Sequence, residues 1–237
     1  MALRTKPLAR LAFELRRIRG QIRQLGVTRR AGRKWNESGS TSSRAYPDYQ
    51  TYLDHQRTKF DAMRSKTLLR HDERFFAGLS ERIKALPFSV AGLRVLCLAA
   101  RQGTEVRAFI ALGAFAIGVD LNPGRANNYV VTGDFHALQY ASASIDLVYS
   151  NSIDHSFDLS LLLTEVKRVL VPAGTLVLEV GTGIADGHGP GMYESFAWTD
   201  PDSLLQKILG NGFALAAESR FTVPWPGVQF VLRPETG

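Results

Sequence analysis

The stretch from Gly92 to Asp120 constrains the fold of this chain more than any other. It reads GLRVLCLAARQGTEVRAFIALGAFAIGVD. RVLCLAA is typical of a buried parallel strand, TEVRAFIALG has apolar residues at helical spacing, and AFAIGVD is a second apolar strand that ends on an acid. The stretch predicts a β-α-β unit, which suits a nucleoside, because the backbone can approach a ligand at the first turn and Asp120 can accept hydrogen bonds from ribose hydroxyls.

Strand-like and helical segments alternate through the rest of the chain. The strands are expected at 93–98, 115–119, 128–132, 145–150, 175–180, 213–219 and 228–232, and the helices near 104–112, 159–170 and 201–210. The connection TVPWPG between the last two strands is too short for a crossover helix, so these strands should form an antiparallel hairpin. The pattern predicts an α/β fold with a doubly wound, mostly parallel seven-stranded sheet and helices on both faces.

Length and composition favour one globular domain with an extension. The chain has 237 residues, of which 45% are hydrophobic and 22% charged. Its single cysteine, Cys97, lies in an apolar strand, so no intramolecular disulfide can form and a reducing compartment is expected. We find no apolar run of the ~20 residues needed to cross a bilayer and no secretory signal, and therefore expect a cytoplasmic protein.

The positive charge of the chain is concentrated at its N-terminus. The net charge is +7, yet residues 1–36 hold eleven Lys/Arg and one acid, which leaves 18 basic and 21 acidic residues in the other 201. An amphipathic helix is expected over Pro7–Leu25, with Leu and Ile at spacings of three and four between the arginines. This basic extension could lie on an anionic membrane surface, touch nucleic acid, or pack on the body or on a second subunit; these alternatives stay open.

Four regions follow from these patterns. Residues 1–36 form the basic extension, 37–48 a linker rich in Ser and Gly, 49–89 a helical cap, and 90–237 the α/β domain. Within the cap, one side of a helix carries polar and aromatic residues at spacings of three or four, namely Tyr49, Tyr52, His55, Gln56 and Lys59. This face is expected either to form a lid over a ligand or to be structural, with Tyr49 and Tyr52 in the core and His55 a hydrogen-bonded surface histidine; the two interpretations are equally favoured.

Polar residues follow four of the expected strands, and ligands of open α/β sheets bind beyond the carboxyl ends of strands. The four segments are Ala99–Glu105, Asp120–Gly124, Gly133–His136 and Ser150–His155. With the later stretch EVKRVLVPAGTLVLEV, they resemble the class I S-adenosylmethionine-dependent methyltransferases over roughly residues 90–235. The resemblance implies that the chain is a methyltransferase with S-adenosylmethionine as its cofactor.

The resemblance also assigns site residues. The first turn would cradle the methionine portion of the cofactor, and Asp120 would bind the ribose hydroxyls. Leu121 would pack beside the adenine ring, and the segment Gly133-Asp134-Phe135 would bind the adenine amino group. The cofactor residues implied are Leu98, Ala99, Ala100, Gly103, Glu105, Asp120, Leu121, Asn122, Gly133, Asp134, Phe135 and Asn151.

The first turn departs from the family pattern of an acid followed by three glycines. Cys97 replaces the acid, and Ala99 and Arg101 replace the first two glycines. Of the three glycines, only Gly103 is present. We expect Glu105 or a backbone carbonyl to replace the missing carboxylate. A nicotinamide dinucleotide fits less well, because the missing glycines would crowd its pyrophosphate.

His155 is the first choice for a general base, with Asp154 beside it, because both follow the fourth strand. An acceptor pocket is expected from the cap and from the glycine-rich loop after the fifth strand, with the residues Tyr49, Tyr52, His55, Ser152, His188, Tyr193, Glu194 and Trp198. No metal is expected, because Asp154, His155 and Asp158 have no further carboxylate clustered with them.

We therefore predict methyl transfer to a small-molecule or glycan-type acceptor. The mildly acidic body argues against nucleic acid bound across it, since phosphate contacts need clustered Lys and Arg. The alternative is an inactive methyltransferase-like binding module that its basic N-terminus tethers to a membrane or to nucleic acid.

Overall fold

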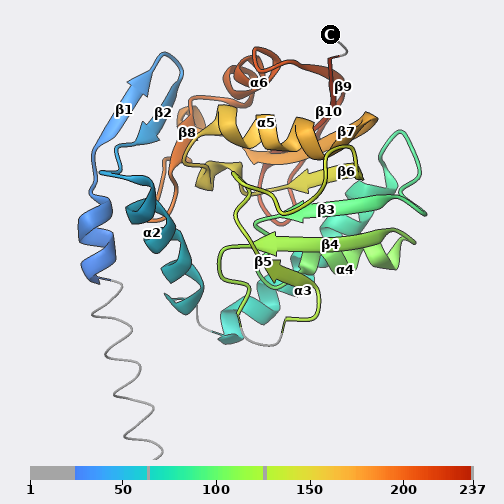
Figure 1. Ribbon diagram of the computed structural model, residues 1–237, viewed down its shortest axis with the longest axis horizontal. Coiled ribbons are helices and arrows are strands. Elements are labelled where there is room, and N and C mark those ends of the chain that lie inside the picture. The colour runs from blue at the N-terminus through green and yellow to red at the C-terminus, as the bar shows by residue number, and fades with distance from the viewer. Residues whose placement is uncertain (1–24, 63–64, 125–126, 236–237) are drawn as a thin grey trace, which may run out of the picture.

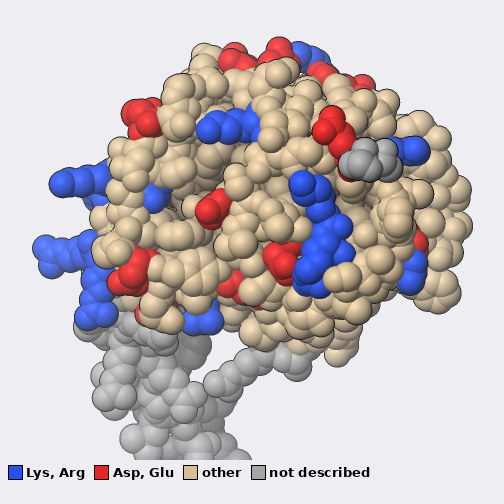
Figure 2. Space-filling model, turned by 45° about the horizontal axis from the view of Figure 1, so that its top comes forward, with Lys and Arg blue, Asp and Glu red and all other residues tan. Residues whose placement is uncertain are grey.

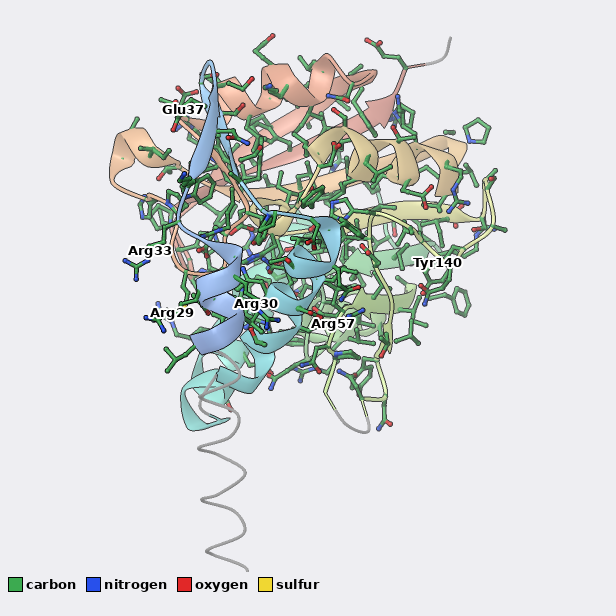
Figure 3. The ribbon with its side chains drawn as sticks, turned by 60° about the vertical axis from the view of Figure 1, so that its left-hand side comes forward. Arg29, Arg30, Arg33, Glu37, Arg57 and Tyr140 are labelled. Carbon is green, nitrogen blue, oxygen red and sulfur yellow. The ribbon has the colours of Figure 1, made fainter. Side chains whose placement is uncertain are left out.

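The computed structural model describes residues 25–62, 65–124 and 127–235, with side chains left aside over 60–71. The predicted helix over Pro7–Leu25 lies, except for its last residue, outside this part of the chain. Residues 25–31 are helical, and Arg29 and Arg33 project from this segment away from the body (Figure 3). None of the described helices is long and apolar enough to cross a membrane.

A seven-stranded sheet forms the centre of the molecule, in the order β5-β4-β3-β6-β7-β10-β9 (Figure 1). Its strands are β3 (Arg94–Leu98), β4 (Phe115–Asp120), β5 (Val130–Thr132), β6 (Ile145–Ser150), β7 (Leu170–Gly181), β9 (Phe213–Phe221) and β10 (Gly227–Pro234). The first five strands of this order run parallel, and β10 is antiparallel to both of its neighbours. The predicted doubly wound sheet with an antiparallel C-terminal hairpin is confirmed.

Helices cover both faces of this sheet. They are α3 (Ser65–Lys84), α4 (Thr104–Ala111), α5 (Leu159–Val169) and α6 (Pro201–Leu209). Three of them were expected from the alternation, whereas residues 65–84 were assigned to the cap and instead pack on the sheet, with Phe75, Leu79 and Ile83 in one core cluster with Val95 and Cys97. Strand β3 shows why both faces are apolar: Leu96 and Leu98 lie in one core cluster, and Val95 and Cys97 in the other. Successive side chains of a strand point to opposite faces, so a strand covered on both sides must be apolar throughout.

Residues 35–44 are not a linker, although 37–44 belong to the segment 37–48 that the composition predicted as one. They form a hairpin of β1 (Trp35–Ser38) and β2 (Thr41–Arg44), and β2 also pairs with β8 (Phe196–Trp198) in a second, antiparallel sheet. Short polar side chains weaken the sequence signal of a strand. Here the backbone ladder to β8 supplies the pairing, and Arg44 donates hydrogen bonds to the carbonyls of Glu194 and Gly32.

Helix α2 (Tyr49–Ala62) lies beside the carboxyl ends of the parallel strands (Figure 1). Two short 3-10 helices, η1 (Ile153–His155) and η2 (Ile184–Asp186), lie in the loops after β6 and β7. This edge of the sheet is therefore enclosed by α2 on one side and by loops on the other. On the face drawn in Figure 2, acidic and basic side chains are interspersed rather than gathered by sign.

Candidate functional site

Three adjoining cavities lie at the carboxyl ends of the parallel strands, next to the point where the strand order reverses. Strands β4 and β5 lie on one side of β3, and β6 and β7 lie on the other. We name the cavities by position: the β4-side cavity, the central cavity and the β7-side cavity. The central cavity shares Lys59, Arg101, Ser152 and His155 with the β4-side cavity, and Asn151, Asp154, Glu194 and Trp225 with the β7-side cavity. The three cavities thus form one continuous groove along the sheet edge, at the topological switch point.

The turn after β3 is tight although two of its expected glycines are missing. Ala99 and Arg101 adopt φ values of 52° and 42°, and Gly103 has φ 81°. Positive φ is uncommon for residues with a Cβ, at a cost of roughly 1–2 kcal/mol each. Gly103 cannot be replaced by a residue with a side chain in the same way, because a Cβ there would lie 2.6 Å from Tyr129 Cβ. The chain therefore keeps the backbone shape of a glycine-rich turn at a cost in strain.

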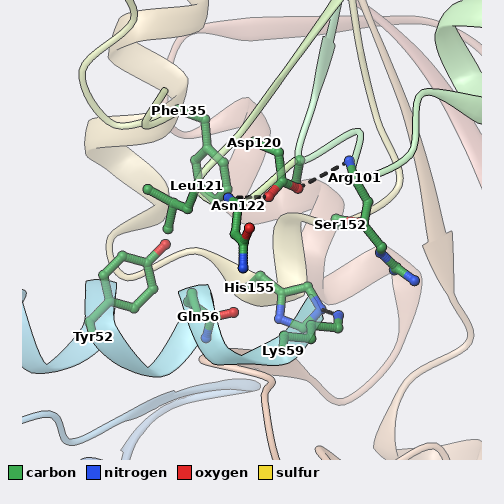
Figure 4. A pocket seen from close by; sticks show the side chains of 11 residues that line it. Tyr52, Gln56, Lys59, Arg101, Asp120, Leu121, Asn122, Phe135, Ser152 and His155 are labelled. Atoms are coloured by element: carbon green, nitrogen blue, oxygen red, sulfur yellow. Dashed lines mark hydrogen bonds between the residues drawn. The ribbon is translucent and has the colours of Figure 1, made fainter. Parts of the chain in front are cut away.

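Asp120 ties this turn to the end of β4. Its carboxylate accepts hydrogen bonds from the backbone N–H of Arg101 (3.1 Å) and of Asn122 (2.7 Å). The same side chain lines the β4-side cavity. Asp120 thus holds two strand-end turns together and still faces the groove (Figure 4).

The β4-side cavity is roofed by α2. Its lining consists of Tyr52, Gln56, Lys59, Ala99, Arg101, Asp120, Leu121, Asn122, Phe135, Ser152 and His155. Figure 4 shows the α2 side chains directed from the helix into the cavity. Room for water-sized molecules is about 50 Å³ here, against about 200 Å³ in the central and about 260 Å³ in the β7-side cavity. The α2 helix therefore lies close over this end of the groove.

The polar-aromatic face of α2 combines the two roles that the sequence left open. Tyr52 is fully buried and lines the cavity, as a lid residue would. Tyr49 and His55 line none of the three cavities. The hydroxyl of Tyr49 donates to Asp134, and His55 Nδ1 bonds the hydroxyl of Tyr46 at 2.9 Å.

Asp134 faces α2 instead of the groove. Its Oδ2 accepts a hydrogen bond of 2.5 Å from the Tyr49 hydroxyl, and its Oδ1 accepts one of 2.9 Å from the backbone N–H of His136. Burial and the neighbouring carboxylate raise the pKa of Tyr49, while the hydrogen bonds hold the pKa of Asp134 below its ordinary value. Leu121, predicted beside the adenine ring, and Phe135, predicted at the adenine amino group, both line the β4-side cavity.

A buried group of ionisable side chains lies where the three cavities meet. His155 is 7% exposed; its Nδ1–H donates to the carbonyl of Tyr193 (3.0 Å), and its Nε2 accepts a hydrogen bond from Lys59 Nζ. Burial and the Lys59 charge lower the pKa of His155 to about 3, so the imidazole is neutral. Burial also lowers the pKa of Lys59 and raises that of Asp154. The lone pair of His155 that a base would use is therefore occupied by a lysine.

Among the described residues, three side chains lie close enough together to bind a metal ion. They are Asp154, His155 and Glu194, whose possible ligand atoms are within 4.8 Å of one another. Asp158, which the sequence placed in this set, instead caps α5 by accepting a hydrogen bond from the N–H of Leu161. Lys59 Nζ already brings a positive charge to His155 Nε2.

The central cavity lies against the turn after β3 and the start of α4. Glu105, Ala100 and Asn151 line it, as predicted for cofactor residues. Burial raises the pKa of Glu105 to about 7. Cys97 is fully buried in the core behind this cavity. Leu98, Gly103 and Gly133, also predicted as cofactor residues, line none of the three cavities and support the backbone around them.

The β7-side cavity is built mainly by loops. The predicted acceptor residues His188, Glu194 and Trp198 line it, whereas Tyr193 stacks on His55 with ring centroids 5.0 Å apart. Its inner wall includes Glu179, whose carboxylate is bound by Arg82 through Nε (2.6 Å) and Nη2 (2.7 Å).

Several lining residues were not among the predicted site residues, among them Gln56, Lys59, Arg101 and Trp225. Gln56 and Lys59 lie on the α2 face at spacings of four and seven from Tyr52, so the helical period contained this signal. Arg101 was not predicted as a site residue, because the family pattern has a glycine at its position. Trp225 comes from the connection between β9 and β10, where no sequence signal pointed to the groove.

Comparison with known proteins adds to this geometry. The family described as "Methyltransferase domain" matches residues 96–178. The malonyl-[acyl-carrier protein] O-methyltransferase 1 of Coxiella burnetii is 33% identical over 88 residues, which are 32% of this chain and 31% of that protein. The chain thus matches about a third of that relative's length.

Two of the solved structures with a similar fold illustrate the likeness. The 1,6-didemethyltoxoflavin-N1-methyltransferase of Burkholderia thailandensis, solved with 1,6-didemethyltoxoflavin and S-adenosylhomocysteine, has a TM-score of 0.64 at 15% identity and covers 86% of this chain and 100% of its own. An S-adenosylmethionine-dependent methyltransferase from Mesorhizobium loti has a TM-score of 0.52 at 18% identity and covers 66% and 98%.

Proposed function

We propose that the chain is a class I S-adenosylmethionine-dependent methyltransferase and that it transfers the methyl group of S-adenosylmethionine to a small-molecule or glycan-type acceptor. The observation that carries this proposal is the continuous groove at the carboxyl ends of β3, β4 and β6, with Asp120 facing it at the end of β4. When bound, the sulfonium of the cofactor supplies an electrophilic methyl group, and the protein has to align an acceptor with it.

We assign the three cavities to the three parts of the reaction. The β4-side cavity takes the adenosine, with the ribose at Asp120 and the purine between Leu121 and Phe135. The central cavity takes the amino-acid portion, where Glu105 and Arg101 offer charges of both signs to an amine and a carboxylate. The β7-side cavity, with about 260 Å³ of room, takes the acceptor; this size suits a small molecule or a single sugar unit.

Acceptor deprotonation is assigned to the group around His155. The hydrogen bond from Nδ1–H to the Tyr193 carbonyl fixes the tautomer and leaves Nε2 as the proton-accepting nitrogen. Lys59 occupies this nitrogen, so His155 can serve as a base only once Lys59 turns away or loses its proton. Asp154, whose pKa burial raises, lies beside it with Oδ2 3.7 Å from Nε2 and offers a second proton acceptor.

Helix α2 has to move when the adenosine binds. Tyr52, Gln56 and Lys59 leave too little room beneath them for a nucleoside. The contacts that hold α2 on the sheet edge therefore have to give way, among them the hydrogen bond from Asn122 Nδ2 to the Arg57 carbonyl (2.7 Å), the one between Lys59 and His155, and the packing of Tyr52 on Phe157 and His136. We infer that α2 opens to admit the cofactor and closes over it, which keeps water from the groove.

Isothermal titration calorimetry with S-adenosylhomocysteine tests the proposal. The full chain should bind it, and Asp120→Asn should bind at least tenfold more weakly, because charge-assisted hydrogen bonds to the ribose are lost and the single amide oxygen can accept only one of the two turn N–H groups that the carboxylate accepts. Asp186→Asn, at an exposed carboxylate in η2 outside the three cavities, is the matched control and should bind as the wild type. Absence of binding at millimolar S-adenosylhomocysteine would contradict the proposal.

A further inference from the structure

The hydroxyl of Tyr52 is a buried polar group whose partner does not come from the described protein. The residue is 0% exposed, and Oη has no hydrogen-bond partner among the described residues. Buried hydroxyls are almost always hydrogen-bonded, because an unpaired one is desolvated without compensation. Such a group marks a place where a bound ligand can supply the missing partner.

This hydroxyl faces one end of the β4-side cavity. Figure 4 shows it directed from α2 towards the end that holds Leu121 and Phe135, while Lys59 and His155 lie at the other end. Leu121 and Phe135 offer the apolar surfaces on which a flat ring can pack. A ring bound between them would present its polar edge to Tyr52.

The ring of Tyr52 is held firmly in place. Its centroid lies 5.4 Å from that of Tyr49, 5.5 Å from Tyr46, 5.2 Å from Phe157 and 5.6 Å from His136. With α2 closed, these aromatic neighbours fix the ring and aim the hydroxyl at the cavity, so the hydroxyl is in place as soon as the helix has closed over a ligand.

The carboxylate that the family resemblance assigned to the adenine amino group is already engaged. Asp134 accepts hydrogen bonds from the Tyr49 hydroxyl and from the backbone N–H of His136, and it does not line the cavity. At this end of the groove, the unsatisfied polar atom that faces the cavity is Tyr52 Oη.

We propose that Tyr52 is a cofactor-binding residue supplied by the lid helix, and that its hydroxyl hydrogen-bonds the edge of the purine ring. A phenol both donates and accepts, so it fits a ring nitrogen or an exocyclic amine. The proposal rests on the proposed function and refines it: α2 contributes directly to cofactor affinity, and the bound purine completes the packing beneath α2.

Tyr52→Phe tests this role, because it removes only the hydroxyl. We expect about tenfold weaker binding of S-adenosylhomocysteine, and the same factor for 5′-methylthioadenosine, which keeps the purine and ribose but lacks the amino acid. The ligand-free variant should unfold at the same or a higher urea concentration than the wild type, since an unpaired buried hydroxyl is removed. Tyr140→Phe is the matched control: Tyr140 Oη is also buried without a partner but lies well away from α2 (Figure 3), and this variant should bind both ligands normally.

Each other outcome has a definite meaning. If Tyr52→Phe binds both ligands like the wild type, the purine contact is wrong while the proposed function stands. If only S-adenosylhomocysteine binding weakens, the hydroxyl serves the amino-acid end and the proposal is wrong. A loss of ligand-free stability that accounts for the weaker binding would make Tyr52 a structural residue. Failure of the wild type to bind S-adenosylhomocysteine would overturn the proposed function itself.

Discussion

The two ends of the groove are built in different ways. The β4-side end is made by strand termini, by the turn after β3 and by a helix packed closely above them, with Asp120 joining two turns through backbone hydrogen bonds. The β7-side end is made partly by the ends of β7 and β8 and partly by loop residues such as Gly183, His188 and Trp225, and it has more room. Under the proposed function, the close-packed end holds the cofactor, and the roomier end, which has more loop residues, is free to vary with the acceptor.

The inner wall of the β7-side end should be the most sensitive point. Glu179 is 1% exposed and is held by the fork of Arg82, by the Tyr149 hydroxyl and by Gln229. Arg82→Met leaves this carboxylate buried without its cation, and we expect a loss of about 3–5 kcal/mol in the free energy of unfolding, measured in urea. The exposed pair of Arg94 and Asp146 is the control: Arg94→Met should cost less than about 1 kcal/mol. Equal losses would show that this wall is no more rigid than the surface.

Two glycines allow the packing at the two ends of the groove to be compared directly, because both have a φ of 81° and so the same backbone strain when replaced by alanine. A Cβ at Gly103, in the turn after β3, would lie 2.6 Å from Tyr129 Cβ, whereas one at Gly187, in the loop after β7, would meet nothing within 4 Å. Gly187→Ala should cost about 1 kcal/mol through backbone strain alone. Gly103→Ala should cost about 3 kcal/mol in the same urea titration, because overpacking adds to the strain. Similar losses for the two variants would contradict the description of the first end as close-packed.

Glu105 should make stability depend on pH at the cofactor end. Its pKa is raised to about 7 in the folded protein by burial, above the ordinary value of about 4.5. The folded state therefore binds the proton more tightly, so this residue's contribution to stability is full below about pH 4.5 and is lost as the pH rises towards 7.

Glu105→Gln removes this dependence. Relative to wild type, the variant should gain on the order of 2 kcal/mol in the free energy of unfolding between pH 5 and pH 8. Thermal unfolding at several pH values checks this. A stability difference that does not change with pH would mean that Glu105 titrates normally and is better solvated than its burial indicates.

The strain in the turn after β3 should give the smallest effect. Ala99→Gly relieves roughly 1–2 kcal/mol of positive-φ strain but adds about 0.5–1 kcal/mol of unfolded-state entropy, so a gain of about 0.5 kcal/mol is expected. Ala100→Gly, at the neighbouring buried residue without positive φ, should instead destabilise. If Ala99→Gly destabilises as much, the turn is not strained.

The predicted strands and helices agree with the structure wherever apolar periodicity was strong. The run Arg94–Leu98 and the helix Leu159–Val169 were both placed within two residues, because a sheet covered on both faces demands continuous apolar strands. The hairpin over residues 35–44 was missed, because its stability comes from pairing with β8, about 155 residues later in the chain. Local composition carries no record of such a partner.

The sequence by itself determined the order of strands and helices, the family resemblance and the position of Asp120 at the end of β4, since each depends on short-range patterns. Tertiary structure alone decided which polar groups meet. Tyr49 bonds Asp134, 85 positions away, Lys59 bonds His155, 96 positions away, and Tyr52 Oη is left facing the groove without a partner. These pairings depend on where α2 packs against the sheet edge, and that placement is set by the summed burial of side chains from distant segments, which no local pattern encodes.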